Sequence, residues 1–142
     1  MLNLTLIPEP INHIPRKWAD PILRASTAKS LLKSPNHLLL ALGKPPAQAY
    51  VLAHLPPHAV ADILTLYTPE SIRRQGYARI LLQVLITHAK NAGCTGLTLE
   101  VRLRNHAAIM LYQSLGFKKV ATRKAYYQNP TEDALVLTLN FS

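Results

Sequence analysis

The sequence predicts a mixed α/β fold in a single domain spanning residues 1–142. The chain is long enough to bury one hydrophobic core, and 49% of its residues are hydrophobic. Short segments in which apolar and polar residues alternate recur along it, which is typical of half-buried strands. Between two of these segments the apolar residues recur at three- and four-residue steps, the spacing of an amphipathic helix.

A helix is predicted early in the chain. Asp20 and Pro21 resemble a helix cap followed by a first-turn proline, and we expect the helix to continue to about Lys33. Prolines and glycine then divide the following residues into short extended segments. The strands predicted over these segments are residues 37–42, 47–55 and 60–68.

The second half begins with the amphipathic helix. Its apolar stripe covers residues 78–92, and Gly93 supplies a natural stop. Asn105 can cap a further helix over residues 106–115, which Gly116 can end. Alternating segments predict three more strands, at residues 95–103, 117–127 and 134–141.

The charge balance favours an anionic partner. The chain has 16 Lys and Arg against 7 Asp and Glu, a formal net charge of +9. A phosphate-bearing ligand or an RNA-rich neighbourhood would fit, and a solvated basic surface without special purpose is an equal alternative. Direct nucleic-acid recognition is not expected, because the basic residues are scattered and no RNA-binding motif or zinc-finger spacing occurs.

Composition also bears on location and metal content. No run of about 18 apolar residues occurs, so no membrane span is expected, and the N-terminus lacks the pattern of a secretory signal. The single cysteine, Cys94, cannot form an internal disulfide, which favours the reducing cytoplasm. We interpret Cys94 as a small packed thiol. The histidines show no metal-ligand spacing, so no metal is expected.

A phosphate site is predicted between the strand at residues 60–68 and the amphipathic helix. Residues 73–78 are Arg-Arg-Gln-Gly-Tyr-Ala, an R-x-x-G-x-A motif. A glycine-bearing turn that opens a helix directs several free backbone N–H groups at one point, where the helix dipole also favours negative charge. Two other phosphate-loop patterns, G-x-x-x-x-G-K-[ST] and G-x-G-x-x-G, are absent from the chain.

This motif resembles the pyrophosphate loop, [QR]-x-x-G-x-[GA], of the GNAT superfamily of acyl-CoA-dependent N-acyltransferases. Residues 97–117, LTLEVRLRNHAAIMLYQSLGF, resemble the second signature block of the superfamily, in the form found in its RimI-type branch. An R-x-x-Y-Y motif at 123–127 and an E-D-A motif at 132–134 are similar to the closing hairpin of that branch. The resemblance covers about residues 59–139, the implied cofactor-binding core. Residues 1–58 match weakly and are expected on the acceptor side.

The resemblance implies a mostly antiparallel sheet, splayed between its fourth and fifth strands, with helices on both faces. RimI-type enzymes acetylate the N-terminal alanine of a small-subunit ribosomal protein. The resemblance therefore implies acetyl-CoA as cosubstrate and a ribosomal protein N-terminus as acceptor. Another peptide, a lysine or a small-molecule amine remain alternatives, as does a non-enzymatic acyl-CoA-binding, ribosome-associated protein. The sequence leaves the oligomeric state open.

An energetic consideration weakly favours an N-terminal acceptor. An α-amine titrates at about 7.7–8.0 and a lysine at about 10.4, so a much larger fraction of the α-amine is neutral and nucleophilic at pH 7. A single carboxylate that acts through water is a modest catalytic apparatus, and it is easier to reconcile with the less basic amine.

The resemblance also implies site residues. Glu100, on the polar face of its strand, corresponds to the general base of the RimI-type enzymes, and the alternative is an exposed strand glutamate paired with Arg102. Tyr112 is the candidate general acid, and the alternative is a core tyrosine. Asn105 would both cap its helix and contact the CoA arm. The implied cofactor-binding residues, on the strand backbone for pantetheine and on the loop for pyrophosphate, are Leu66, Tyr67, Thr68, Arg73, Arg74, Gln75, Gly76, Tyr77, Ala78, Arg79 and Asn105.

Overall fold

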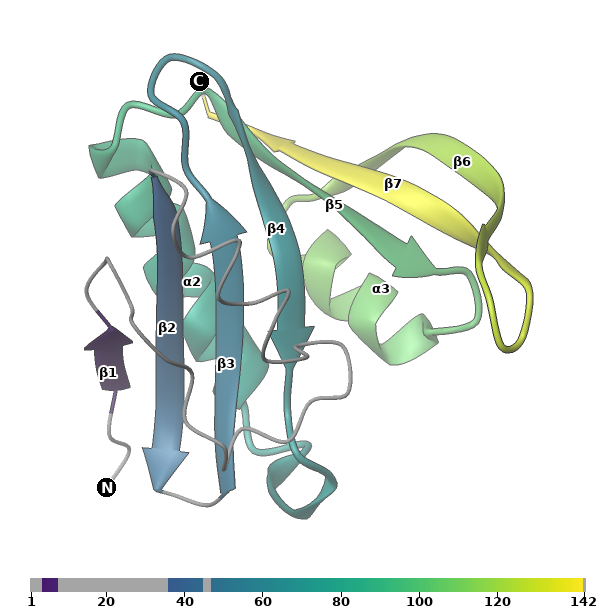
Figure 1. The fold of residues 1–142 in the computed structure, drawn as a ribbon, viewed down its shortest axis with the longest axis horizontal. Helices are drawn as coiled ribbons and strands as arrows, with labels where there is room; N and C mark the ends of the chain where they lie inside the picture. Colours follow the sequence, from purple (N-terminus) through teal and green to yellow (C-terminus); the bar gives the residue numbers. More distant parts are fainter. Residues whose placement is uncertain (1–3, 8–35, 45–46, 142) are drawn as a thin grey trace.

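A seven-stranded sheet forms the centre of the molecule in the computed structural model, which describes residues 4–7, 36–44 and 47–141 (Figure 1). The strands are β1 (Leu4–Ile7), β2 (His37–Lys44), β3 (Ala47–His54), β4 (Val60–Tyr67), β5 (Gly96–Arg102), β6 (Lys118–Tyr127) and β7 (Glu132–Asn140). They lie in the order β1-β2-β3-β4-β5-β7-β6. The helical elements are the 3₁₀ turn η1 (Glu70–Ile72) and the α-helices α2 (Tyr77–Asn91) and α3 (His106–Ser114).

The predicted strands and helices that fall on described residues are confirmed, with ends that move by two residues at most. Two elements were not predicted, β1 and η1. The helix expected from Asp20 to Lys33 lies outside the described residues, so the expectation of helices on both faces of the sheet stays a prediction.

The sheet opens between β4 and β5, which confirms the predicted splay. These two strands pair in parallel over only three residue pairs, the last of which is Asp62 with Thr98. Beyond that pair β5 remains in register with β7 as far as Arg102 and Ala134, so β5 follows β7 away from β4. Figure 1 shows the divergence, with α3 in the angle between the two arms.

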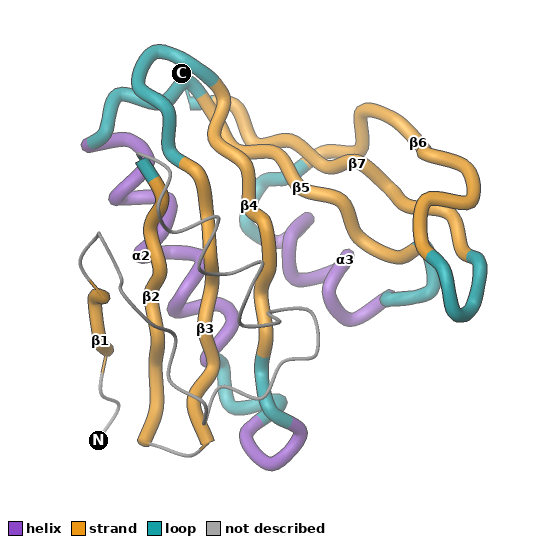
Figure 2. Tube along the Cα trace, viewed as in Figure 1, coloured by secondary structure: helices purple, strands orange, loops and turns teal. Residues whose placement is uncertain are grey.

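The main core lies between α2 and the sheet. Because apolar residues recur along one side of α2, four of its side chains are buried there: Leu81, Leu82, Leu85 and Ala89. In Figure 2, α2 lies behind β2 and β3. The alternation predicted for β4 is present, since Ala61 and Ile63 are buried while Val60, Asp62 and Leu64 are exposed.

The two faces of β5 differ in chemistry. Leu97, Leu99 and Val101 belong to the same buried cluster as Tyr112 of α3. Side chains alternate between the faces of a strand, so Glu100 and Arg102 lie on the opposite face. Side chains on the two faces of β5 are therefore separated by the strand, and a bound molecule could meet both only at the opening between β4 and β5.

Candidate functional site

A cavity of about 650 Å³ lies where the end of β4, the following loop, the N-terminus of α2 and the first turns of α3 meet. Its lining residues are Leu66, Tyr67, Thr68, Ile72, Arg73, Arg74, Gly76, Tyr77, Ala78, Arg79, Asn105, Ala107, Ala108, Leu111 and Tyr112. Of the predicted cofactor-binding residues, all except Gln75 line this cavity. Tyr112 lines it as well, whereas Glu100 does not.

The start of α2 has the geometry of an anion site. Gly76 precedes the helix with φ +82° and ψ 7°, in the left-handed region that favours glycine, and no side chain caps the helix. Among the described residues, the first backbone N–H of this turn with a carbonyl acceptor is that of Ile80, which donates to Gly76 O at 3.1 Å. The preceding N–H groups are therefore available to an anion, and the first turn of α2 contains no acidic residue to compete.

Side-chain hydrogen bonds hold the loop in place. Arg73 donates from Nε to Thr68 O at 2.9 Å, which ties the loop to the end of β4. Arg79 donates to Ser114 Oγ at 3.0 Å, which ties the N-terminus of α2 to the end of α3. Arg73 and Arg79 thus shape the cavity as well as adding positive charge to its wall. Arg74 adopts a positive φ of 64°, so the turn is sharply bent before Gly76.

The end of β4 offers an unpaired backbone edge. On one side, Leu66 and Tyr67 pair with β3 opposite Val51 and Tyr50. On the other side, within the described chain, β4 has no pairs with β5 beyond Asp62. Backbone groups there need partners, and an extended chain of amides could supply them by adding as a strand. This supports Leu66, Tyr67 and Thr68 as the pantetheine contacts.

The ring of Tyr67 packs against that of its cross-strand neighbour Tyr50. Its ring centroid lies 5.6 Å from that of Tyr50, which is fully buried. Tyr67 therefore contributes its backbone to the β4 edge, while its ring contacts Tyr50.

Asn105 has the capping role that the sequence predicts. Its Oδ1 accepts a hydrogen bond from Ala108 N at 3.2 Å, at the start of α3. Asn105 also lines the cavity. Its contact with the CoA arm stays a prediction.

Tyr112 combines its two alternative interpretations, since it is both a core tyrosine and a cavity residue. Its ring packs edge-on against Phe117 at 5.7 Å and is 7% exposed. Burial raises the pKa of the Tyr112 hydroxyl above its ordinary value, and the nearby Tyr127 raises the pKa further. The hydroxyl is therefore protonated at neutral pH, the state that a proton donor needs.

Replacing Tyr112 by Phe is expected to lower kcat by about 10²-fold, the lower range for general acid–base catalysis. Because the raised pKa keeps the hydroxyl protonated, wild type and Tyr112→Phe should share the same basic limb of the kcat–pH profile up to about pH 10. Steady-state kinetics across this range measure both. An unchanged kcat in Tyr112→Phe would remove Tyr112 from the mechanism.

Glu100 lies on the other face of β5, and its ion-pair partner is Arg123. Glu100 Oε1 is 3.6 Å from Arg123 Nη2, and the Glu100 side chain is 28% exposed. The alternative pairing of Glu100 with Arg102 is wrong, because Arg102 pairs with Glu132 across 3.3 Å. The predicted base and the predicted acid are thus on different faces of the β5 arm.

The sequence interpretation missed four lining residues: Ile72, Ala107, Ala108 and Leu111. Ala108 lies three residues after Asn105, and Leu111 and Tyr112 lie three and four residues after Ala108. One face of α3 therefore carries them all. That spacing was available in the sequence. Ala107 and Ala108 contribute only small side chains to the cavity wall.

Other features of the described chain do not point to a second chemistry. Cys94 is buried, its Sγ lies 3.3 Å from Pro56 O, and burial raises its pKa, as expected for a packed thiol. Over the same described ranges, no three His, Cys, Asp or Glu side chains gather as a metal site would require. No helix there is long and apolar enough to cross a membrane.

The chain is similar in sequence to a known protein family and to curated members of known activity. The family model described as "Acetyltransferase (GNAT) family" matches residues 8–117. A ribosomal protein bS18-alanine N-acetyltransferase from Escherichia coli K12 is 39% identical over 84 residues, which cover 58% of this chain and 57% of that protein. An N-alpha-acetyltransferase from Saccharolobus solfataricus is 38% identical over 76 residues, 53% of this chain and 45% of that protein. The chain thus spans about half the length of these curated relatives.

A solved structure agrees over a greater length. The crystal structure of the ribosomal-protein-S18-alanine N-acetyltransferase from Escherichia coli superposes with a TM-score of 0.79 and 25% sequence identity. The superposition covers 100% of this chain and 95% of that one.

Proposed function

Because the chain belongs to the Acetyltransferase (GNAT) family, we propose that it transfers an acetyl group from acetyl-CoA to an amine, the N-terminal α-amino group of a ribosomal protein that begins with alanine. One observation carries the proposal: the free N–H groups at the start of α2 and the unpaired edge of β4 line the same cavity. The first suits a pyrophosphate and the second suits the extended amide arm that joins a pyrophosphate to a thioester.

The residues of the cavity fit acetyl-CoA in charge and polarity. Arg73, Arg74 and Arg79 line the end beside Gly76, where phosphates would bind. Leu66 and Leu111 contribute apolar surface between that end and Tyr112. Acetyl-CoA, when bound, supplies an acyl group activated as a thioester.

Two side chains would carry out the proton transfers, Glu100 on one face of β5 and Tyr112 on the other. On the polar, half-buried face of β5, Glu100 takes a proton from the attacking amine, through a water molecule. On the cavity side, the buried Tyr112 hydroxyl holds a proton for the departing sulfur. A backbone N–H on the unpaired stretch of β4 can donate to the carbonyl oxygen as negative charge develops there, which is worth about 2.7–4 kcal/mol in enzymes of other folds.

The acceptor is inferred from relatives and from the chemistry of amines. Two relatives are named as acetyltransferases of a ribosomal protein alanine and of N-alpha groups. The higher neutral fraction of an α-amine at pH 7 points the same way. Another peptide, a lysine or a small amine is the alternative. The single cysteine, Cys94, is a buried free thiol, which is compatible with action in the reducing cytoplasm.

A binding protein without turnover is the alternative from a different class. Such a protein would need the loop at Gly76 and the β4 edge, but neither a carboxylate at Glu100 nor a protonated Tyr112 at the far end of the cavity. The presence of both groups, one on each face of β5, favours catalysis.

Two measurements test the proposal. Calorimetry with CoA should detect binding, and the absence of association at millimolar CoA would refute the family-based cofactor. Incubation with acetyl-CoA and a panel of peptides, some beginning Ala-Arg and some with a blocked N-terminus and a lysine, should yield product only from free α-amines. Mass spectrometry locates the added acetyl group. Modification of lysine alone would instead support the alternative acceptor.

A further inference from the structure

We propose that Arg102 is a positioning residue, which ties the β6–β7 turn and Tyr127 to the end of β5 and so holds the wall beside Glu100 that an acceptor amine meets. The inference rests on the proposed function. It concerns the face of β5 opposite the cavity, where the roles drawn so far involve Glu100 alone.

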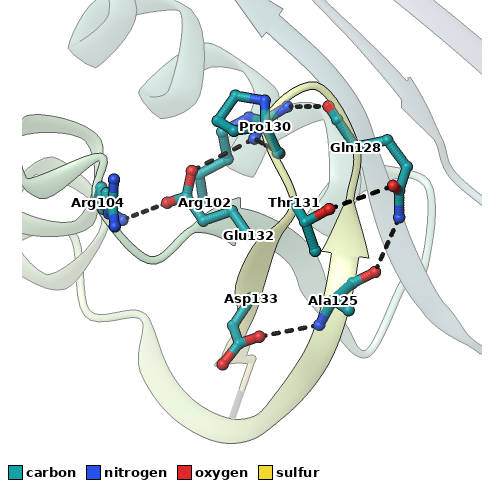
Figure 3. A network of polar contacts seen from close by, with 8 residues as sticks. All are labelled: Arg102, Arg104, Ala125, Gln128, Pro130, Thr131, Glu132 and Asp133. Carbon is teal, nitrogen blue, oxygen red and sulfur yellow. Dashed lines mark hydrogen bonds and ion pairs between the residues drawn. The ribbon is translucent and has the colours of Figure 1, made fainter.

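Arg102 makes several contacts with one short turn (Figure 3). Its Nη1 lies 3.3 Å from Glu132 Oε1 and also donates to Pro130 O at 3.3 Å. Its Nη2 donates to Gln128 O at 3.2 Å. One planar guanidinium therefore joins the turn to β5 at three positions, a geometry that the compact ammonium of lysine cannot reproduce.

Two carboxylates at the start of β7, next to the turn, make further hydrogen bonds. Glu132 Oε2 accepts from the backbone N–H of Arg104 at 2.7 Å, so Glu132 is bound from two sides, and its side chain is 11% exposed. Asp133 Oδ1 accepts from Ala125 N at 2.9 Å, where β6 and β7 lose register and Ala125 has φ +50°. In this part of the hairpin, side chains replace the missing ladder pairs.

The contacts of Arg102 with the turn continue to Glu100 through an arginine–tyrosine cluster, which consists of Arg102, Tyr127, Tyr126 and Arg123. Arg102 Cζ lies 4.4 Å from the ring centroid of Tyr127, which packs edge-on against Tyr126 at 5.0 Å. Arg123 Cζ lies 5.4 Å from the ring centroid of Tyr126 and its Nη2 reaches Glu100. The contacts are continuous from Arg102 to the proposed base.

The electrostatics of Tyr127 agree with this placement. Burial, followed by the neighbouring Tyr126 and Glu100, raises the pKa of Tyr127 to about 12, while Arg102 acts in the opposite direction. Glu100 is thus close to Tyr127 as well as paired with Arg123. Tyr127, in contact with Arg102 and Tyr126, is therefore a neutral neighbour of Glu100.

Rigid placement beside a base matters because a reacting amine must approach in one orientation. A misplacement of about 1 Å can cost on the order of 10²-fold in rate. If Arg102 only stabilised the fold, its loss would affect cofactor and acceptor alike. As a positioning residue, its loss should affect the acceptor and leave the cofactor, because neither Arg102 nor Tyr127 lines the cavity.

The experiment compares Arg102→Ala, Arg102→Lys and the matched control Arg104→Ala. Arg104 is two residues away and carries the same charge, and its hydrogen bonds in the described chain involve its backbone, with Glu132 and His106 as partners. We expect Arg102→Ala to raise the acceptor KM by about tenfold, as loss of hydrogen bonds to a charged group predicts. The Kd of CoA should change less than twofold. Arg102→Lys should behave like Arg102→Ala, and Arg104→Ala like wild type.

Amide hydrogen exchange supplies a readout that does not require turnover. Exchange at residues 127–132 should become faster in Arg102→Ala and stay unchanged in Arg104→Ala. An acceptor KM within twofold of wild type in Arg102→Ala, or an equal loss in Arg104→Ala, would overturn the inference. If wild type binds CoA but acetylates no amine, the proposed function fails. In that case, unchanged exchange in Arg102→Ala would independently refute the proposal that Arg102 holds the turn in place.

Discussion

Replacing Glu100 by Gln is expected to reduce kcat by about 10²–10⁴-fold, the contribution of a positioned general base. Glutamine has nearly the same shape but cannot accept the proton that the amine must lose. The affinity for acetyl-CoA should stay within about twofold of wild type, because Glu100 lies outside the cavity on the opposite face of β5. Presteady-state mixing with the acceptor peptide, together with calorimetry for CoA, separates the two effects.

The control for this variant is Glu70→Gln, which makes the same chemical change at an exposed position in η1. It removes one negative charge from the chain without touching the exposed face of β5, so its kcat should match that of wild type. Equal losses in the two variants would mean that overall charge matters and that Glu100 is not the base. A kcat for Glu100→Gln close to wild type would likewise exclude it.

Gly76→Ala is expected to weaken CoA binding by about tenfold or more, because it alters the turn that directs the free N–H groups of α2. A Cβ at Gly76 would meet no atom within 4 Å, so the change introduces no clash. It penalises the left-handed backbone at φ +82° by roughly 1–2 kcal/mol. The turn can relieve that strain only by rotating, which turns the N–H groups away from a common point.

Gly93→Ala provides a matched comparison at the other end of the same helix. Gly93 has φ +84°, and a Cβ added there would also meet no atom within 4 Å, so the backbone penalty is the same. Both variants should therefore lose a similar free energy of unfolding in urea titrations, and only Gly76→Ala should lose CoA affinity. Equal CoA affinities in the two variants would show that the Gly76 turn does not hold the pyrophosphate.

The loop and its helix could be predicted from sequence because their signals are local. Gly76 and the stripe of α2 lie within one short segment, and a turn before a helix has few conformations. Asn105 was predicted as a cap for the same reason, since its partner Ala108 is three residues away. Such features depend on neighbours in the chain and need no knowledge of the sheet.

The partners of the charged residues on β5 could not be predicted from nearby sequence. Glu100 and Arg102 share a face and are two residues apart, which suggested that they pair. In the structure β7 lies beside β5 and β6 lies beside β7, so the hairpin brings Arg123 to Glu100 and Glu132 to Arg102. The order of strands decides these contacts.

The first strand was missed for a similar reason. Residues 4–7, Leu-Thr-Leu-Ile, are too short for periodicity to distinguish a strand from an irregular apolar segment. Their pairing with residues 39–42 of β2, more than thirty positions later, makes them a strand. The 3₁₀ turn η1 likewise follows from the bend between Thr68 and Arg73, which a hydrogen bond across the bend stabilises.

The three-pair seam between β4 and β5 has a mechanical consequence. Within the described residues, backbone pairing joins the β4 and β5 arms of the sheet at one end alone, so the arms could move relative to each other about that end. A molecule that forms hydrogen bonds with β4 and also contacts α3 would link the two arms. Its binding would restrict movement of the arms and raise the melting temperature of the domain. Its release would allow the arms to move apart again.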